Sequence, residues 1–186
     1  TVLKSKNGGI LISAHVGNFE IAEYFLNELE EDVTISLLTT DSEHGDIKAY
    51  LESVTTKSNI KFIIIKDDLS HIFEINAALS RNEIICFTGD RYVKPSKSLS
   101  HNLFGQEALF PAGPFLLGSR LKVPVIFVYV MKETTTRYHL YARIADVKQR
   151  DQMALLKSYT ESLEWMLKKY PLQWFNYFDF WNDLKD

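Results

Sequence analysis

Cysteine is almost absent from this sequence. Of its 186 residues only Cys86 carries a thiol, and it lies within the apolar segment NEIICFTG. A single cysteine cannot form an internal disulfide, and one in such a segment is typical of a small apolar strand residue. The sequence therefore predicts a protein of a reducing compartment.

The sequence also lacks a large excess of charge of one sign and long hydrophobic runs. The net charge is -3 and charged residues make up 24% of the chain, so the sequence has no global basic field and nucleic acid is not expected as a partner. The longest apolar run, VPVIFVYVM at residues 123–131, is shorter than the roughly 20 residues that cross a bilayer. No secretory signal pattern opens the chain. We therefore expect a protein that is soluble or bound peripherally to a membrane.

Several motifs of catalysis and cofactor binding are missing. No Gly-x-Gly-x-x-Gly or Walker-type loop follows the first predicted strand, and no Gly-x-Ser-x-Gly motif occurs. None of the 5 histidines has the spacing to another His or Cys that a zinc site needs, so no metal or cofactor is expected. A doubly wound protein that binds a nucleotide or small metabolite stays an alternative, which a thermal-shift screen of nucleotides would test.

Apolar segments of strand and helix periodicity alternate along the chain. With 46% hydrophobic residues, a chain of this length can form a single domain with a substantial core. The alternation predicts an α/β fold with a mostly parallel central sheet and helices on both faces, because parallel neighbours need crossover connections. A loop rich in Ser, Lys, Gly and Pro is predicted for residues 91–113. Strands are predicted at residues 8–14, 33–40, 60–65, 83–88, 123–131 and 138–145, and helices at residues 19–30, 45–58, 69–82, 114–122 and 152–170.

The segment HVGNFE at residues 15–20 joins the first predicted strand to the first predicted helix. His15 follows the carboxyl end of the strand, where open α/β sheets bind ligands, and Asn18 is a candidate N-cap. A turn at Gly17 would bring His15 over the helix start, where an ionised Glu20 could orient the imidazole. The segment could equally be a capped strand-turn-helix in which the histidine is incidental. Its spacing alone leaves both interpretations open.

The order of four segments resembles the lysophospholipid acyltransferase superfamily, and within it the bacterial lipid A biosynthesis (lauroyl/myristoyl) acyltransferases. HVGNFE matches the H-x-G-N-x-E form of that family's first motif, and CFTGDR at residues 86–91 is similar to its strand ending in Gly-Asp-Arg. Residues 103–126 resemble its aromatic-Gly stretch with a Pro-x-Gly turn, a helix and a proline-bearing strand. YPLQWFNYFDFW at residues 170–181 resembles its closing Tyr-Pro-x-Gln-Trp segment.

This resemblance implies a glycerolipid-acyltransferase-like fold and acyl transfer to a lipid. The donor would be a thioester, acyl carrier protein or coenzyme A, and the acceptor a hydroxyl or amine of a lipid A precursor or lysolipid. Residues 1–186 would form one catalytic domain, a fragment without the N-terminal membrane-anchoring segment of the family. The expected location is the cytoplasmic face of the bacterial inner membrane, with peripheral membrane contact. A non-catalytic lipid-binding domain of the same fold is the alternative.

The matched motifs also imply roles for particular residues. His15 would be the general base that removes the acceptor's proton, and Glu20 its orienting partner. Arg91 offers a planar donor fork for a phosphate or carboxylate, while Asp90 could hold Arg91 in place. The same pair could be a surface salt bridge of little value. The residues expected to bind substrate are Asn18, Asp90, Arg91, Pro111 and Gly113.

Pro111 and Gly113 would shape a turn into the next helix, whose free amides could hold an anion or a developing oxyanion. A plain helix-start turn explains these residues almost as well. The basic residues Arg91, Lys94 and Lys97 could meet an acidic carrier protein or anionic lipid, or form a solvated loop. The aromatic residues of 170–181 could form an interfacial belt or dock into the core, and we expect docking.

Overall fold

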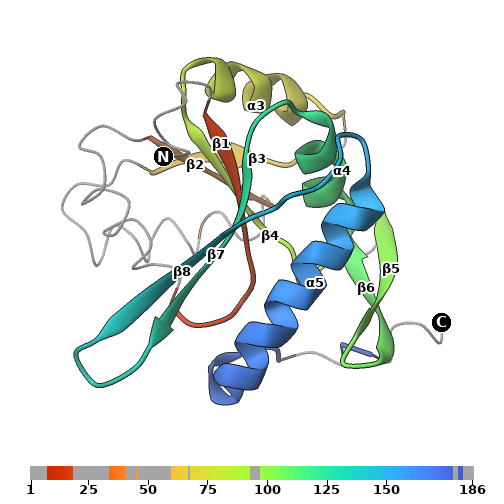
Figure 1. Cartoon of the computed structure of the whole chain (residues 1–186). Coiled ribbons are helices and arrows are strands. Elements are labelled where there is room, and N and C mark those ends of the chain that lie inside the picture. The colour runs from red at the N-terminus through yellow and green to blue at the C-terminus, as the bar shows by residue number, and fades with distance from the viewer. Residues whose placement is uncertain are drawn as a thin grey trace. The chain divides into compact units, whose positions relative to one another are not determined.

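A central six-stranded sheet organises the protein (Figure 1). The structure is a computed structural model that describes residues 8–18, 34–40, 45, 60–66, 68–92, 97–177 and 180–181. The strand order is β3-β2-β4-β1-β7-β8, and β5 and β6 form a separate two-stranded sheet. The strands are β1 (Gly9–Ser13), β2 (Ile35–Thr39), β3 (Ile60–Ile64), β4 (Ile84–Thr88), β5 (Ser98–Leu103), β6 (Gln106–Pro111), β7 (Val125–Lys132) and β8 (Tyr138–Ile144). The helices are α3 (His71–Ser80), α4 (Ala112–Arg120) and α5 (Gln152–Lys169), with a 3₁₀ turn, η3, at Pro171–Gln173.

The pairing of the strands confirms the predicted α/β class and mostly parallel sheet. β2 pairs in parallel with β3, with Ile35 opposite Ile60, and also in parallel with β4, with Ile35 opposite Ile84. β7 and β8, at the edge of the sheet, are antiparallel and form a hairpin in which Tyr129 lies opposite Tyr141. Among the described residues, no helix is both long and apolar enough to span a bilayer.

The chain divides into two compact units. One is formed by Thr1–Leu11 and Glu23–Phe87, and the other by Ile12–Ala22 and Thr88–Asp186. The sequence prediction of one domain over the whole chain stays a prediction. The predicted helices at residues 19–30 and 45–58 lie outside the described residues, apart from the helical Gly45.

A buried carboxylate ties the strands of the first unit together. Glu83 is 3% exposed and accepts hydrogen bonds from the Ser36 hydroxyl, the Lys61 amino group and the Arg81 guanidinium, each at 2.7 Å. Burial by itself would raise the pKa of Glu83, but these three donors outweigh it and lower the pKa to about 2. The side chain is therefore ionised at neutral pH and fully paired.

Helix α5 forms the core of the second unit together with β7. Every residue of β7 from Val125 to Met131 is buried, which explains why this strand is the longest apolar run of the chain. α5 begins where Asp151 caps it, its carboxylate accepting from the Ala154 N–H at 2.9 Å. Its buried face, which includes Leu156 and Leu163, packs against α4 and β5 (Figure 1). The amphipathic pattern at residues 152–170 is thus confirmed as a helix.

The predicted loop at residues 91–113 is wrong over most of its length. β5 and β6 pair antiparallel from Ser98 opposite Pro111 to Leu103 opposite Gln106. In β6 the buried Ala108 and Phe110 are two positions apart, which is the strand period, but the Ser- and Lys-rich composition of the stretch obscured it. Gly105, with φ +80°, closes the hairpin. The inward residues Leu103, Ala108 and Phe110 are all 0% exposed.

Candidate active site

The segment after β1 makes a tight turn that carries His15. Gly17 has φ +69°, and a Cβ atom there would lie 2.1 Å from the carbonyl oxygen of Val130 in β7. The same carbonyl accepts the Asn18 N–H at 2.7 Å. Only glycine combines this backbone conformation with so close an approach. The expected turn at Gly17 is therefore present, and it is held against β7.

The Asp90 carboxylate contacts both the ring and the backbone of His15. Its Oδ1 lies 2.8 Å from Nδ1 of the imidazole, and its Oδ2 accepts the backbone N–H of His15 at 2.9 Å. The Asp90 side chain is 1% exposed, whereas that of His15 is 24% exposed. A buried carboxylate thus fixes the backbone and the ring of a histidine whose other edge reaches solvent. The sequence did not predict this contact.

The His15–Asp90 geometry determines what the imidazole can do. An ionised carboxylate only accepts hydrogen bonds, so Nδ1 of His15 carries the proton. In the neutral ring, Nε2 then keeps its lone pair and can accept a proton from a bound hydroxyl or amine. Asp90 would stabilise the imidazolium that results. The pair is therefore suited to general base catalysis.

The strand ends that carry His15 and Asp90 are linked to each other and to α5 by hydrogen bonds to one carbonyl group. Ser13 O, at the end of β1, accepts the Gly89 N–H at 2.9 Å and the Tyr159 hydroxyl of α5 at 3.0 Å. Tyr159 is 0% exposed. Burial, with the negative charge of Asp90 nearby, raises the pKa of Tyr159 well above its ordinary value, so the hydroxyl stays a neutral donor. A Cβ on Gly89 would lie 2.9 Å from the Tyr159 ring, so this position also requires a small residue.

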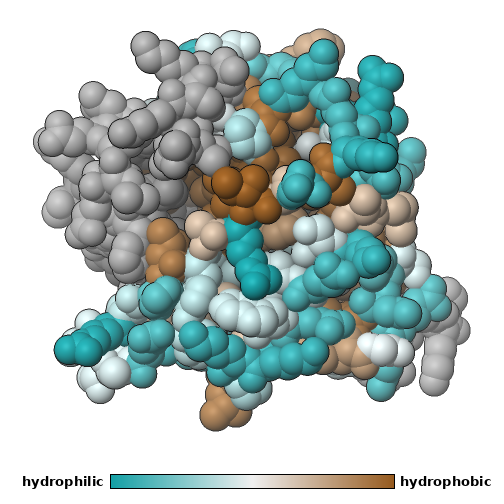
Figure 2. Space-filling view, viewed as in Figure 1, coloured by the Kyte–Doolittle hydropathy of each residue, from teal (hydrophilic) through white to brown (hydrophobic). Residues whose placement is uncertain are grey.

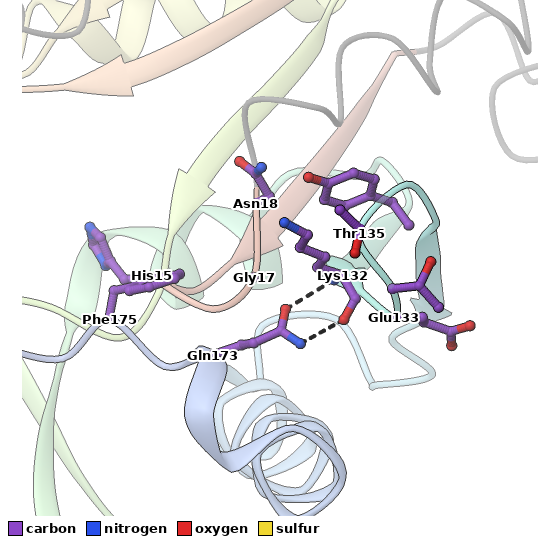
Figure 3. A pocket seen from close by; sticks show the side chains of 10 residues that line it. His15, Gly17, Asn18, Lys132, Glu133, Thr135, Gln173 and Phe175 are labelled. Carbon is purple, nitrogen blue, oxygen red and sulfur yellow. Dashed lines mark hydrogen bonds between the residues drawn. The ribbon is translucent and has the colours of Figure 1, made fainter.

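The C-terminal segment pairs with the His15 turn from the other side. The Gly17 N–H donates to Gln173 O and the Phe175 N–H donates to His15 O, both at 2.8 Å. The Gln173 side chain in turn clasps the backbone of Lys132, accepting its N–H at 2.9 Å and donating to its carbonyl at 2.8 Å (Figure 3). The Arg91 guanidinium donates to the carbonyl of Phe175. The turn is thus fixed by segments far apart in the sequence.

A hollow of about 720 Å³ opens beside His15. Figure 3 shows Asn18 and Lys132 on its wall, with the Lys132 amino group directed towards the segment that carries Asn18. Lys132 makes no ion pair with the residues that the structure describes. The hollow is lined by His15, Gly17, Asn18, Lys132, Glu133, Thr134, Thr135, Tyr138, Gln173 and Phe175.

Comparison with known families gives this site a context. A family model described as bacterial lipid A biosynthesis acyltransferase matches residues 1–181. The chain belongs to this family. No individual curated protein matches it. The resemblance carried by the four sequence segments is therefore confirmed, and the protein is assigned to a family of acyltransferases of lipid A biosynthesis.

The structure brings some of the predicted site residues of this lipid A acyltransferase together and leaves others apart. It brings His15, Asn18 and Asp90 together, whereas Glu20 lies outside the described residues. Arg91 adjoins Asp90 in sequence but points its guanidinium to the backbone of Phe175. A role for Glu20 in catalysis and for Arg91 in binding substrate therefore stays a prediction.

Pro111 and Gly113 lie at the start of α4. Pro111 ends β6 with φ -62° and ψ 130° and is the N-cap of the helix, and the Ala112 N–H donates to Lys97 O. Gly113 is exposed, with open space where a Cβ would stand. None of the hydrogen bonds found among the described residues joins this turn to His15. Its predicted part in binding substrate stays a prediction.

Sequence reasoning missed the wall of the hollow formed by Lys132, Glu133 and Tyr138. Lys132 is the last residue of β7, which lies next to β1 in the sheet. The rule that pointed to His15, a polar residue at the carboxyl end of a buried strand, applies equally to Lys132. Gln173 belonged to a recognised motif but had no assigned role. Its clasp on Lys132 could not be read from spacing, because 41 residues separate the two.

The described residues contain no cluster of three or more His, Cys, Asp or Glu side chains that could hold a metal ion. The thiol of Cys86 lies in β4 as predicted; the residue as a whole is half-buried, and burial of the thiol raises its pKa to about 12. It therefore stays protonated at neutral pH and is unsuited to be a nucleophile.

Proposed function

We propose that this protein transfers a fatty acyl chain from an acyl thioester to a hydroxyl or amine of a lipid, with His15 as the general base. The observation that carries the proposal is the 2.8 Å contact between His15 Nδ1 and Asp90 Oδ1, at the edge of an open hollow. Membership of the family supports acyl transfer in lipid A biosynthesis. A lipid A precursor or a lysolipid is the proposed acceptor, and acyl carrier protein or coenzyme A carries the donor.

The proposed step needs no covalent enzyme intermediate. Nε2 of His15 takes the proton of the acceptor hydroxyl or amine as its oxygen or nitrogen attacks the thioester carbonyl. The tetrahedral intermediate collapses, the carbon–sulfur bond breaks, and the leaving thiolate takes the proton back from the imidazolium. The products are an acylated lipid and a free thiol. Asp90 accepts the hydrogen bond from Nδ1 of His15 throughout and holds the ring in position.

The charges around the hollow suit an acceptor with an anionic group. Lys132 lies on the wall with its amino group free of carboxylates among the described residues, and Asn18 and Tyr138 add polar groups. A compact ammonium charge of this kind binds a phosphate or carboxylate. The proposed location is the cytoplasmic face of the inner membrane, with peripheral contact, because the proposed acceptor is a membrane lipid and the proposed donors, acyl carrier protein and coenzyme A thioesters, are cytoplasmic.

The test is consumption of acyl thioester by the wild type, His15→Ala and a matched control, His139→Ala. His139 is an exposed histidine of β8 that does not itself line the hollow; its Nδ1 lies 3.7 Å from Oε1 of Glu133 in an exposed pair of little value, so its loss should change the rate little. Acyl carrier protein and coenzyme A thioesters would be offered with a total bacterial lipid extract, and the product identified by mass spectrometry. We expect lipid-dependent turnover that His15→Ala abolishes.

Two other outcomes would count against this proposal. Equal activity of His15→Ala and wild type would remove the histidine from the mechanism. A folded wild type that consumes no thioester with either donor, but binds the lipid extract, would instead support the non-catalytic lipid-binding alternative.

A further inference from the structure

The C-terminal aromatic segment divides into two sets with opposite exposure. Trp174, Phe180 and Trp181 pack edge to face on one another, with ring centroids 5.2 to 6.0 Å apart. Phe180 is 4% exposed and also contacts Phe110 of the β5–β6 hairpin. Phe180 docks into the core and the half-buried Trp174 and Trp181 pack on it, so the docking expected for the aromatic residues of 170–181 holds for these three rings and not for the whole segment. A second set, Leu172, Phe175 and Tyr177, is exposed and is called here the rim patch.

The exposure of the rim patch is large for apolar side chains. Leu172 is 93% exposed, Tyr177 85% and Phe175 43%. Single exposed apolar residues are ordinary on protein surfaces, but three within six positions of one segment are not scattered. In Figure 2 an apolar side chain protrudes from an otherwise hydrophilic surface where Figure 1 draws the end of α5. The rings of Phe175 and Tyr177 lie with their centroids 6.4 Å apart, and exposed apolar side chains that cluster in this way are typical of a surface with a partner.

The backbone of this segment is fixed, so the exposure is imposed by the fold. Gln173 O and the Phe175 N–H bond to both sides of the His15 turn, and Trp174 bridges to Val16. The Gln173 side chain is clasped to Lys132. Leu172 and Phe175 are thus held outward while the residues between them bind inward. The segment cannot turn its apolar side chains into the protein without breaking these bonds.

The rim patch borders the proposed active site. Phe175 lines the hollow itself and lies beside His15 in Figure 3, and Gln173 next to Leu172 lines it too. Two exposed lysines, Lys168 and Lys169, end α5 just before the patch; Lys168 pairs with Glu164 at 3.5 Å, and Lys169 donates to the Tyr141 hydroxyl at 2.6 Å. An apolar surface flanked by lysines matches the boundary of an anionic lipid layer, where aromatic rings and lysine side chains are both favoured.

We propose that the rim patch inserts into a lipid layer containing anionic headgroups and seats the mouth of the hollow on it. The proposal rests on the proposed function, since it names how that site reaches a water-insoluble acceptor. The acceptor would then enter the hollow from the membrane side, past Phe175, without crossing water. Lys168 and Lys169 add electrostatic attraction to the apolar contact.

The test is sedimentation of the wild-type chain and variants with sucrose-loaded vesicles. One set is phosphatidylcholine alone, and the other contains phosphatidylglycerol as one quarter of the lipid. We expect binding to the anionic vesicles and a loss of at least ten-fold in Leu172→Ser/Tyr177→Ser, because burial of these side chains supplies the apolar part of the affinity. Lys168→Gln/Lys169→Gln should bring the binding to anionic vesicles close to that of neutral ones.

The matched control is Ile144→Ser. Ile144 is 64% exposed, lies in the same unit, and ends β8, six residues beyond the hollow-lining Tyr138 or about 20 Å along the strand. It should bind vesicles as the wild type does. Leu172, Tyr177 and Ile144 are exposed, so the circular dichroism and unfolding midpoints of Leu172→Ser/Tyr177→Ser and Ile144→Ser should match the wild type. Lys168→Gln/Lys169→Gln also removes the ion pair with Glu164 and alters the bond to the Tyr141 hydroxyl, so its vesicle binding is compared at a temperature where circular dichroism shows it folded.

Equal vesicle binding by wild type and Leu172→Ser/Tyr177→Ser would overturn the proposal, as would an equal loss in Ile144→Ser. Vesicle binding needs no catalysis, so the two proposals can fail separately. If the wild type binds vesicles through the rim patch but consumes no thioester, the membrane-binding proposal stands and the acyl-transfer proposal fails. If Leu172→Ser/Tyr177→Ser transfers acyl chains to vesicle-borne lipid at the full rate, the acyl-transfer proposal stands and the membrane-binding proposal fails.

Discussion

His15 and Asp90 are 75 residues apart in sequence, yet one carboxylate binds both the imidazole and the backbone N–H of the histidine. The contact joins the ends of β1 and β4, which are neighbours in the sheet. It turns two separate sequence motifs, HVGNFE and CFTGDR, into one chemical unit.

Asp90→Asn should lower kcat by on the order of 10²- to 10⁴-fold while the chain stays folded. The amide nitrogen would donate to Nδ1 of His15 and favour the tautomer that has its proton on Nε2, which cannot accept another. Initial rates of thioester consumption measure the effect. Asp146→Asn, at an exposed aspartate, is the control and should be as active as the wild type. An Asp90→Asn enzyme with near-normal kcat would show that the carboxylate has no part in catalysis.

Gly17→Ala should destabilise the protein by about 2 kcal/mol or more and reduce activity strongly. The added Cβ combines an unfavourable φ of +69° with a position 2.1 Å from the carbonyl oxygen of Val130, so the His15 turn must move away from β7. The free energy of unfolding in urea and the initial rate are the two measurements.

Gly105→Ala separates the effect of a positive φ from the effect of the close approach to β7. Gly105 has a similar φ of +80°, but nothing lies within 4 Å of the position of its Cβ. This variant should lose about 1 kcal/mol of stability from backbone conformation alone and keep its activity. If Gly17→Ala behaved no differently from Gly105→Ala, the close approach of the turn to β7 would be refuted.

Glu83→Gln should make the free energy of unfolding depend less on pH in the acidic range. The folded pKa of about 2 lies below the ordinary value of 4.5, so the ionised side chain stabilises the folded state above pH 4.5. That contribution, roughly 3 kcal/mol from the size of the shift, is lost as the pH falls towards 2. Urea unfolding of wild type and variant should therefore differ most at pH 7 and converge in acid. Glu161→Gln, at an exposed glutamate of α5, should show no such pH-dependent difference.

Tyr159→Phe should reduce kcat several-fold with little change in KM. The variant keeps the buried ring but removes the hydroxyl that donates to Ser13 O, the carbonyl that also accepts from Gly89. Its loss should cost about 1 kcal/mol of stability and loosen the link between the strand ends behind His15 and Asp90. Steady-state kinetics and urea unfolding would be compared. A fall in stability with unchanged kcat would show that the hydroxyl supports the fold but does not position the catalytic pair.

Periodicity predicted the strands and helices of the described residues well because their burial is simple. β7 is buried along seven consecutive positions, and α5 has one continuous apolar face, so each pattern has one interpretation. The β5–β6 hairpin was missed because β5 has only Leu99 and Leu103 among serine, histidine and asparagine, and this composition is typical of a loop. What distinguishes it is that Leu103, Ala108 and Phe110 are buried in the core, which is a property of the packing.

The sequence by itself determined the α/β class, the family and the histidine at a strand end, because local periodicity and short motifs record these features. Only the tertiary structure decided that Asp90 holds His15, that Gln173 clasps Lys132, and which C-terminal aromatics are buried. Each of these contacts joins residues that are distant along the chain, so it depends on strand order and on the path of the C-terminal segment. Spacing within a motif carries no information about either.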